Sequence, residues 1–156
     1  MRICLIVVGL FATFTLATAS AQSLQFTNPP ALGSPATYTH VVRAGKTLYI
    51  AGQVAAGSDG KVVGPAMADQ VRQVLANLKT ALASQGGEVQ HIAKINIYVT
   101  DMDAFRAADA AKVRADFFGT HKPASTLVQV VRLASPDYKV EIEAIAVLPR
   151  ASSPKP

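Results

Sequence analysis

The spacing of hydrophobic residues changes in a regular order along the middle of the chain. Residues 38–42 and 47–53 are rich in β-branched and aromatic residues, and a short turn with a glycine joins them, so two strands are predicted. Residues 55–64 hold three glycines and are expected to form a loop or a weak edge strand. From residue 67 to residue 84 the apolar positions recur every three or four residues. This spacing predicts an amphipathic helix that stops at Gly86-Gly87.

The second half of the chain shows the same two kinds of spacing. Residues 93–99 alternate between apolar and polar side chains, which is typical of a half-buried strand. An aspartate that follows, Asp101 or Asp103, is predicted to cap a second helix that ends near Phe118. Two further strands are predicted, at residues 126–131 and 140–147.

The predicted order is strand, strand, helix, strand, helix, strand, strand. Over residues 38–148 this order favours a single α+β domain in which both helices cover one face of a mixed β-sheet. The other face still displays the apolar side chains Leu127, Val131, Ile145 and Val147. Because a large apolar face is rarely left in water, we expect other copies of the chain to cover it.

Both ends of the chain lie outside this pattern. Residues 1–21 combine a positive start, an apolar run and the small-residue pattern Ala19-Ser20-Ala21, which predicts a secretory signal peptide cleaved after Ala21. The apolar run is shorter than the roughly 20 residues of a membrane span, and an uncleaved anchor is the alternative. We therefore expect a periplasmic or secreted protein without membrane attachment after cleavage. Residues 22–37 are predicted to be an extended leader, and residues 149–156 a disordered tail.

Composition excludes several classes of protein. Half of the 156 residues are hydrophobic and the formal net charge is +5, so an intrinsically disordered chain is excluded. Cys4 is the only cysteine and belongs to the predicted signal peptide, which excludes a thiolate nucleophile and a Cys-ligated zinc site in the mature chain. The three histidines are isolated, so no metal site is expected. The basic residues are not interleaved with aromatic residues, and nucleic acid is not an expected partner.

Two carboxylates in the last predicted strand are candidates for chemistry. A period of two places Glu141 and Glu143 on one face, beside Ile145. A carboxylate on a largely apolar face is costly unless it is paired, solvated or used in a reaction. Pairing with Arg132 or Lys139 is one interpretation, and a catalytic carboxylate, Glu141 in particular, is the other.

Four short segments carry a more specific signal. They are Leu48–Gln53, Val99–Met102, Pro123–Thr126 and Val140–Ala146. In sequence, order and separation they closely resemble the Rid family of reactive intermediate deaminases, also called the YjgF or endoribonuclease L-PSP-like family. The resemblance runs from about Tyr38 to Val147.

This resemblance implies a chorismate-mutase-like fold and a homotrimer with a small-molecule cleft at each subunit boundary. Archetypal members hydrolyse enamines and imines, such as 2-aminoacrylate, to 2-keto acids and ammonia without a metal or cofactor. The resemblance gives Glu141 the role of positioning or activating the attacking water. It places Tyr38 in the substrate pocket, and Ala51 and Gly52 on the strand whose backbone borders the cleft.

The chain departs from the family pattern at positions that hold the substrate. Ser125 stands where established deaminases have the Arg that binds the substrate carboxylate, and Leu127 stands where Cys is frequent. Asp109 stands where the family often has Asn, and its negative charge would weaken the binding of an anionic substrate. Losing a bidentate Arg–carboxylate contact costs on the order of 2–5 kcal/mol. Lys112 or Lys122 is a candidate to replace the missing charge.

These observations lead to three functional hypotheses. The favoured one is an exported Rid-like protein that binds a small metabolite between subunits and has weak or no 2-imino-acid deaminase activity. The alternative is an active enamine/imine deaminase that uses Glu141 and another cation. An endoribonuclease is the least favoured.

Overall fold

The strands and helices follow the predicted order closely. The computed structural model describes residues 23–149. Its elements are β1 (Leu24–Thr27), η1 (Pro30–Leu32), β2 (Val41–Ala44), β3 (Thr47–Val54), α1 (Met67–Ala83), η2 (Val89–His91), β4 (Ile92–Val99), α2 (Met102–Arg106), α3 (Ala108–Phe118), β5 (Ala124–Gln129) and β6 (Val140–Val147). The predicted signal peptide, and residues 150–156 of the predicted tail, lie outside the described residues. No helix within residues 23–149 combines the length and the apolar character needed to cross a bilayer.

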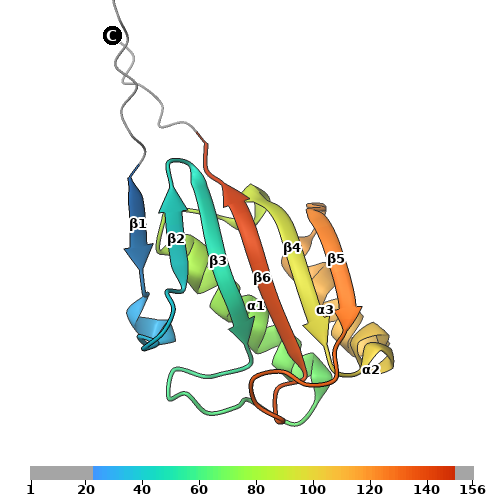
Figure 1. Cartoon of the computed structure of the whole chain (residues 1–156). Helices are drawn as coiled ribbons and strands as arrows, with labels where there is room; N and C mark the ends of the chain where they lie inside the picture. Colours follow the sequence, from blue (N-terminus) through green and yellow to red (C-terminus); the bar gives the residue numbers. More distant parts are fainter. Residues whose placement is uncertain (1–22, 150–156) are drawn as a thin grey trace, which may run out of the picture.

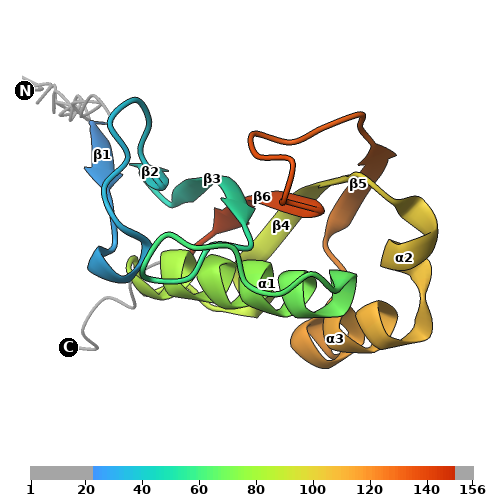
Figure 2. The ribbon, with the colours of Figure 1, turned by 90° about the horizontal axis from the view of Figure 1, so that it is seen from below.

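The six strands form one mixed sheet in the order β1-β2-β3-β6-β4-β5 (Figure 1). Neighbouring strands are antiparallel except β4 and β5, which are parallel because the chain returns through α2 and α3 between them. Figure 2 shows the helices α1 and α3 below the sheet, while the opposite side of the sheet carries no helix. The predicted α+β fold, with its helices on one face of a mixed sheet, is confirmed.

The hydrophobic core lies between the helices and the sheet. Helix α1 contributes the residues that the sequence spacing selected, namely Val71, Val74, Leu75, Leu78 and Leu82, all of which are buried. Ile95 and Ile97 of β4 and Ile142 of β6 face them from the sheet. Removing these side chains from water is the main source of stability in a domain of this kind.

The second predicted helix is divided in two. The carboxylate of Asp101 caps α2 by accepting a hydrogen bond from the Ala104 N–H (2.9 Å), but Ala107 has an extended backbone and separates α2 from α3. Phe105 of α2 is buried. The Arg114 guanidinium donates to the Phe105 carbonyl (2.6 Å), which replaces the helical partner that the break removes. The prediction of one continuous helix was wrong, because alanine-rich spacing does not mark a break.

Part of the segment predicted as an extended leader is a strand of the sheet. Strand β1 pairs with β2, with Leu24 opposite Ala44 and Thr27 opposite Val41. Leu24 and Phe26 are exposed, although both are large and apolar. The strand is only four residues long and two prolines follow it closely, so the hydrophobic pattern does not reveal it.

The face of the sheet that lacks helices, called the open face below, carries exposed apolar side chains. Those on or next to its strands are Leu24, Phe26, Tyr49, Val128, Ile145 and Val147. The prediction was right for Ile145 and Val147 but wrong for Leu127, which packs against the core. In the parallel register Leu127 lies opposite Ile97, whose side chain points to the helices, so Val128 takes the outward position. Val131 is exposed, but it lies in the loop after β5, which ends at Gln129, and is not part of the sheet.

Gln70 of α1 fixes the loop that leads into β6. Its side chain is 1% exposed. It donates to the carbonyl oxygens of Gly64 (3.1 Å) and Asp137 (2.8 Å) and accepts from the Lys139 N–H (2.8 Å). Lys139, which directly precedes β6 and lies two residues before Glu141, is therefore tied to the helical layer.

We expect Gln70→Leu to lower the free energy of unfolding by about 1–3 kcal/mol, because the change leaves buried backbone groups without partners. Chemical denaturation measures this loss. Gln90→Leu, at an exposed position in η2, is the matched control and should change stability by less than about 0.5 kcal/mol. Equal losses in the two variants would contradict this role of Gln70.

Candidate functional site

Glu141 lies on the open face, directly over Gly52 of the neighbouring strand β3. A Cβ atom added to Gly52 would come within 1.8 Å of Glu141 Oε1 and 2.7 Å of its Cδ, so a residue without a side chain is required to leave the carboxylate in this place. The pairing of β3 with β6 also shifts between Ile50 and Gln53, as at a β-bulge. At Gly52 the Glu141 carboxylate therefore lies against the backbone of β3, without a side chain between them.

Tyr38 lies close to Glu141, and a buried pair supports it. Burial, followed by the charges of Glu141 and Tyr138, raises the pKa of the Tyr38 hydroxyl, which stays protonated as a hydrogen-bond donor at neutral pH. The Tyr38 ring meets the His40 ring edge-on, with centroids 5.5 Å apart. The His40 ring nitrogens lie 3.1 Å from the Leu32 carbonyl oxygen and 3.3 Å from Gln53 Nε2. The sequence offered no signal for this pairing of His40 with Gln53.

A hollow of about 270 Å³ adjoins this group and is lined in part by Tyr38, His40, Gly52, Gln53 and Tyr138. Two tyrosines and two amide residues, Gln53 and Asn77, therefore line the hollow together with Gly52, the glycine over which Glu141 lies. This is a mixed polar lining of the kind that orients a small ligand.

The environment of Glu141 changes its proton affinity. Burial raises the pKa of the Glu141 carboxyl, and the nearby charge of Glu143 raises it further. A carboxyl with a raised pKa is a better proton acceptor once it is ionised, which suits general acid–base work on a bound water.

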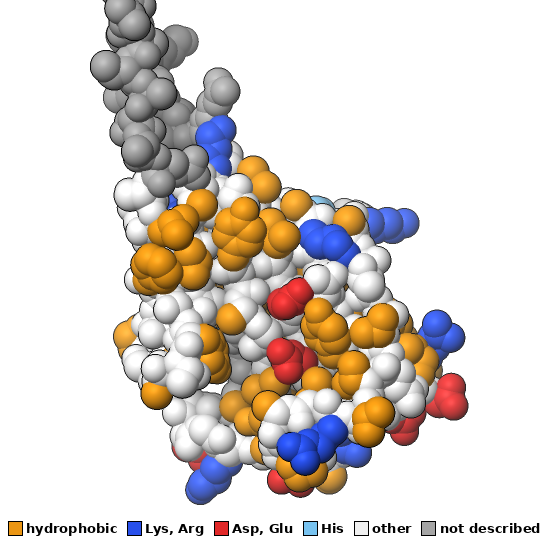
Figure 3. Space-filling view, in the orientation of Figure 1, with side chains coloured by type: hydrophobic (Ala, Val, Ile, Leu, Met, Phe, Trp, Pro, Cys, Tyr) orange, Lys and Arg blue, Asp and Glu red, His pale blue; other side chains and the backbone are white. Residues whose placement is uncertain are grey.

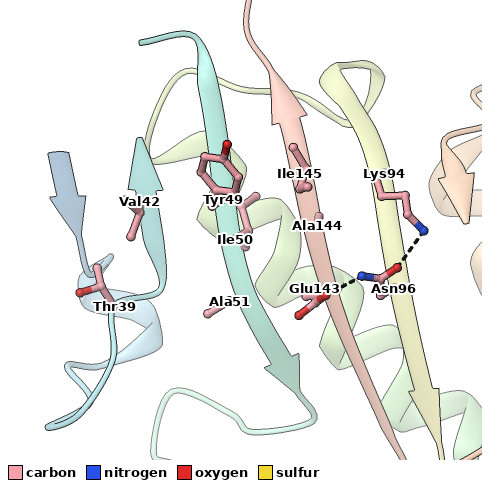
Figure 4. Close-up of a pocket in the computed structure, with 10 residues that line it drawn as sticks. All are labelled: Thr39, Val42, Tyr49, Ile50, Ala51, Lys94, Asn96, Glu143, Ala144 and Ile145. Atoms are coloured by element: carbon pink, nitrogen blue, oxygen red, sulfur yellow. Dashed lines mark hydrogen bonds between the residues drawn. The ribbon is translucent and has the colours of Figure 1, made fainter. Parts of the chain in front are cut away.

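Glu143 is held by neutral groups. Its Oε1 accepts from Asn96 Nδ2 (2.6 Å) and from the Tyr98 hydroxyl (3.4 Å). Lys94 Nζ in turn donates to Asn96 Oδ1 (2.8 Å), so Asn96 stands between the ammonium and the carboxylate (Figure 4). The ion pairs found in residues 23–149 do not include Glu141 or Glu143, and pairing with Arg132 or Lys139 is not observed there.

A pocket of about 320 Å³ opens beside Glu143 on the open face (Figure 4). Its walls come from the segment before β2 and from β2, β3, β4 and β6, and its lining residues are Thr39, Val42, Tyr49, Ile50, Ala51, Lys94, Asn96, Glu143, Ala144 and Ile145. Figure 3 shows two acidic side chains near the middle of this face, with hydrophobic side chains on both sides of them. The face is therefore acidic at its centre, with apolar side chains around the acidic pair.

The other residues that the sequence singled out lie elsewhere in the chain. Ser125 and Leu127 lie opposite Ile95 and Ile97 on β5, and thus point to the helix-covered face. Asp109 lies on α3 and lines a separate groove between α1 and α3. In that groove the Lys112 ammonium pairs with Asp116 at 2.8 Å. Lys122 lies in the short connection between α3 and β5 and is exposed. One chain therefore brings Tyr38, Ala51, Gly52 and Glu141 together, and does not bring Asp109, Ser125 and Leu127 to them.

No group of three or more His, Cys, Asp and Glu side chains within residues 23–149 is arranged to hold a metal ion.

We expect Glu141→Gln to be more stable than the wild type at pH 7. The pKa of Glu141 is raised in the folded state, so folding is favoured while the group is protonated, and this advantage is lost as pH rises through the folded pKa. The amide removes the cost of ionisation. The melting temperature should rise by roughly 1–3 °C at pH 7, the shift that a fraction of a kcal/mol produces in a domain of this size.

Thermal unfolding between pH 4 and pH 8 measures this effect. The two proteins should converge below the ordinary carboxyl pKa of 4.5, where Glu141 is protonated in both the folded and the unfolded chain. Asp103→Asn removes one carboxylate at an exposed position and should show no gain at pH 7. A wild type that is more stable than Glu141→Gln at pH 7 would contradict the electrostatic account.

Comparison with known families places this site in a defined class of proteins. The family described as endoribonuclease L-PSP matches residues 29–148. The chain therefore belongs to this family, which is also called the Rid or YjgF family, and the resemblance stated above is confirmed.

Individual relatives agree with this assignment. A RutC family protein of Pyrococcus horikoshii is 40% identical over 110 residues, covering 70% of this chain and 85% of the relative. The 2-iminobutanoate/2-iminopropanoate deaminase of Dermatophagoides farinae is 30% identical over 113 residues, covering 71% of this chain and 85% of the relative. The crystal structure of Escherichia coli TdcF with bound serine superimposes with a TM-score of 0.70 at 32% identity, covering 78% of this chain and 96% of TdcF.

Proposed function

We propose that this protein binds a small metabolite at Glu141, in a cleft completed by another copy of the chain, and has weak or no 2-imino-acid deaminase activity. The observation that carries the proposal is the contrast between two positions. Glu141 lies over Gly52, and the family resemblance assigns Ser125 to the position of the carboxylate-binding Arg. On this assignment the carboxylate that would activate water is present, and the guanidinium that would bind a substrate carboxylate is absent.

The separation of the site residues supports a cleft between copies. Glu141 lies on the open face, whereas Ser125 and Leu127 face the helices near the β5 edge. A single ligand contacts both groups only if two chains supply them. The exposed apolar side chains of the open face provide a surface for such association, and a homotrimer of the kind that the family resemblance implies is the proposed assembly.

Active imine hydrolysis is the second candidate function. It is favoured by the intact Glu141 site and by the deaminase relative from Dermatophagoides farinae. In this reaction water adds to the carbon of a C=N bond while Glu141 accepts a proton from it. The nitrogen then leaves as ammonia and a carbonyl compound remains. Lys122 is the remaining candidate for the missing cation, since the Lys112 ammonium is paired with Asp116.

The endoribonuclease activity in the family description is the least supported candidate. A site for RNA must bind phosphates, which requires Lys and Arg side chains. The acidic pair Glu141 and Glu143 lies instead on β6, between β3 and β4 in the open face, and would repel a phosphate backbone.

Export is part of the same proposal, and it is supported by the pattern of residues 1–21. Amino-terminal sequencing of the protein recovered from a host with a Sec system tests it. A mature chain that begins at Gln22 supports export, and a full-length chain retained in the cytoplasm contradicts it.

The deaminase assay tests the proposed function. We expect the mature protein to hydrolyse 2-iminobutanoate with a kcat/KM at least tenfold below that of the Dermatophagoides farinae deaminase, because the guanidinium contact is absent. An amino acid oxidase generates the imine, and semicarbazide traps what is not hydrolysed. Light scattering of the same sample measures the oligomeric mass, for which three chains are expected. Activity equal to that of the reference enzyme would overturn the proposal in favour of the second candidate.

A further inference from the structure

We infer that this site selects nitrogen compounds that lack a carboxylate, namely neutral or protonated imines derived from amines rather than imines of amino acids. The inference rests on the proposed function and specifies its ligand. It follows from the charges that face the site, from the partners of the nearest cation and from the shape of the adjoining pocket.

Two carboxylates face the same part of the open face. Glu141 and Glu143 are two residues apart on β6, so their Cα atoms are about 7 Å apart and both side chains project the same way. The titratable groups that face them from other elements are Tyr38 before β2, Tyr49 on β3, Lys94 and Tyr98 on β4, and Tyr138 before β6. All of these groups except Lys94 are phenols, which carry no positive charge.

Lys94 is the one ammonium among the described residues that line the pocket, and its donors are already used. Its Nζ donates to Asn96 Oδ1 (2.8 Å), Thr126 Oγ1 (2.6 Å) and the Ile95 carbonyl (3.4 Å). An ammonium has three N–H donors, so all of them have partners within the chain. Lys94 therefore orients Asn96 toward Glu143 and does not offer a free donor to a ligand carboxylate.

The pocket beside Glu143 suits a small apolar body with a cationic end. Val42, Tyr49 and Ile145 line its apolar side, and Glu143 stands at the other side (Figure 4). Asn96 and Tyr98 both donate to Glu143 Oε1, which leaves Oε2 as an acceptor. An ammonium or iminium group satisfies this acceptor, whereas a carboxylate placed here would face like charge without a compensating donor.

The family resemblance places Ser125 and Asp109 among the residues that the second copy would add. Ser125 is neutral and Asp109 is acidic, so neither supplies the positive charge that a carboxylate needs, and Lys122 is the one cation proposed for that place. The retained chemistry remains possible for an amine-derived imine. A protonated imine, R₂C=NH₂⁺, reacts with one water to give R₂C=O and NH₄⁺, so atoms and charge balance without an oxidant or reductant. Such an imine is the two-electron oxidation product of a primary amine.

A pair of compounds that differ only in the carboxylate tests the inference. Calorimetric titration of the assembled mature protein with propylammonium and with 2-aminobutyrate compares their affinities. Semicarbazide trapping compares hydrolysis of the matching imines, propan-1-imine and 2-iminobutanoate, released by an amine oxidase and an amino acid oxidase. We expect at least a tenfold preference for propylammonium and for propan-1-imine. Glu143→Gln should reduce this preference at least fivefold, whereas Glu88→Gln, on the exposed turn η2, should leave it unchanged.

The outcomes separate the inference from the proposed function. Equal or tighter binding of 2-aminobutyrate would overturn the inference and leave metabolite binding at this site standing. Absence of binding and of hydrolysis for both pairs would overturn the inference alone, because the proposed function already expects little or no hydrolysis of 2-iminobutanoate. Hydrolysis of 2-iminobutanoate as fast as by the reference deaminase would overturn the proposed function. A preference for propylammonium that Glu143→Gln leaves intact would show that the selectivity does not come from these carboxylates, which also overturns the inference.

Discussion

Ser125→Arg is expected to raise kcat/KM for 2-iminobutanoate by a factor of about 30 or more. The guanidinium restores the bidentate contact with the substrate carboxylate, which is worth on the order of 2–5 kcal/mol. At about 1.4 kcal/mol per factor of ten, this range corresponds to a gain of about 30-fold to several thousand-fold. The gain requires the rest of the cleft, including Glu141 over Gly52, to be intact. The semicarbazide assay measures it.

Two control variants isolate the guanidinium. Ser125→Met adds a side chain of comparable length without charge and should give no gain. Thr126→Arg adds the same guanidinium one residue further along β5, where the side chain points to the opposite face, and should not restore activity on the amino-acid imine. No gain from Ser125→Arg, or an equal gain from Ser125→Met, would contradict the view that a single missing cation limits the reaction.

Gly52→Ala is expected to remove about 99% of the activity that Ser125→Arg restores, while the fold remains stable. The new Cβ would overlap Glu141 Oε1, which is the mobile end of a flexible side chain, so the carboxylate moves aside rather than the strand. A displacement of about 1 Å at a reacting group can cost about 100-fold in rate. The experiment compares the double variant with Ser125→Arg alone, in kcat/KM and in melting temperature.

Gly57→Ala is the matched control for this substitution. The chemical change is the same, but the added Cβ would meet the exposed Asp59 side chain at 3.2 Å, the Val63 side chain at 3.7 Å and the Lys61 carbonyl oxygen at 3.8 Å, and none of these atoms belongs to Glu141. It should leave kcat/KM within about twofold. If both glycine variants lose activity equally, or if Gly52→Ala unfolds the protein, Gly52 does not act by making room for Glu141.

Much of the fold could be predicted from hydrophobic spacing because its core elements are regular. In α1 the residues at the three- and four-residue spacing are the buried ones, and in β4 and β6 buried residues alternate with more exposed ones as the sequence predicts. The errors fall where local pattern is weak. Ala107 interrupts an alanine-rich segment without a glycine or proline to mark the break, and the register of β5, which turns Leu127 inward, depends on its pairing with β4.

The candidate site shows a similar division. The two-residue period placed Glu141 and Glu143 on one face, as the structure has them. The contact between Glu141 and Gly52, the His40–Gln53 pair and the Lys94–Asn96–Glu143 chain join residues that are far apart in sequence, so no local pattern specifies them. The placement of Ser125 near Glu141 is harder still to predict from the sequence, because in the proposed assembly the two residues come from different chains.

The most direct test is a crystal structure of the assembled wild-type protein soaked with serine, the compound bound in the TdcF structure. The account predicts that no Arg or Lys nitrogen lies within hydrogen-bond distance of the space beside Ser125, and that no serine carboxylate is held there. A serine bound through its carboxylate to a guanidinium, such as Arg132 of a neighbouring copy, would contradict the account.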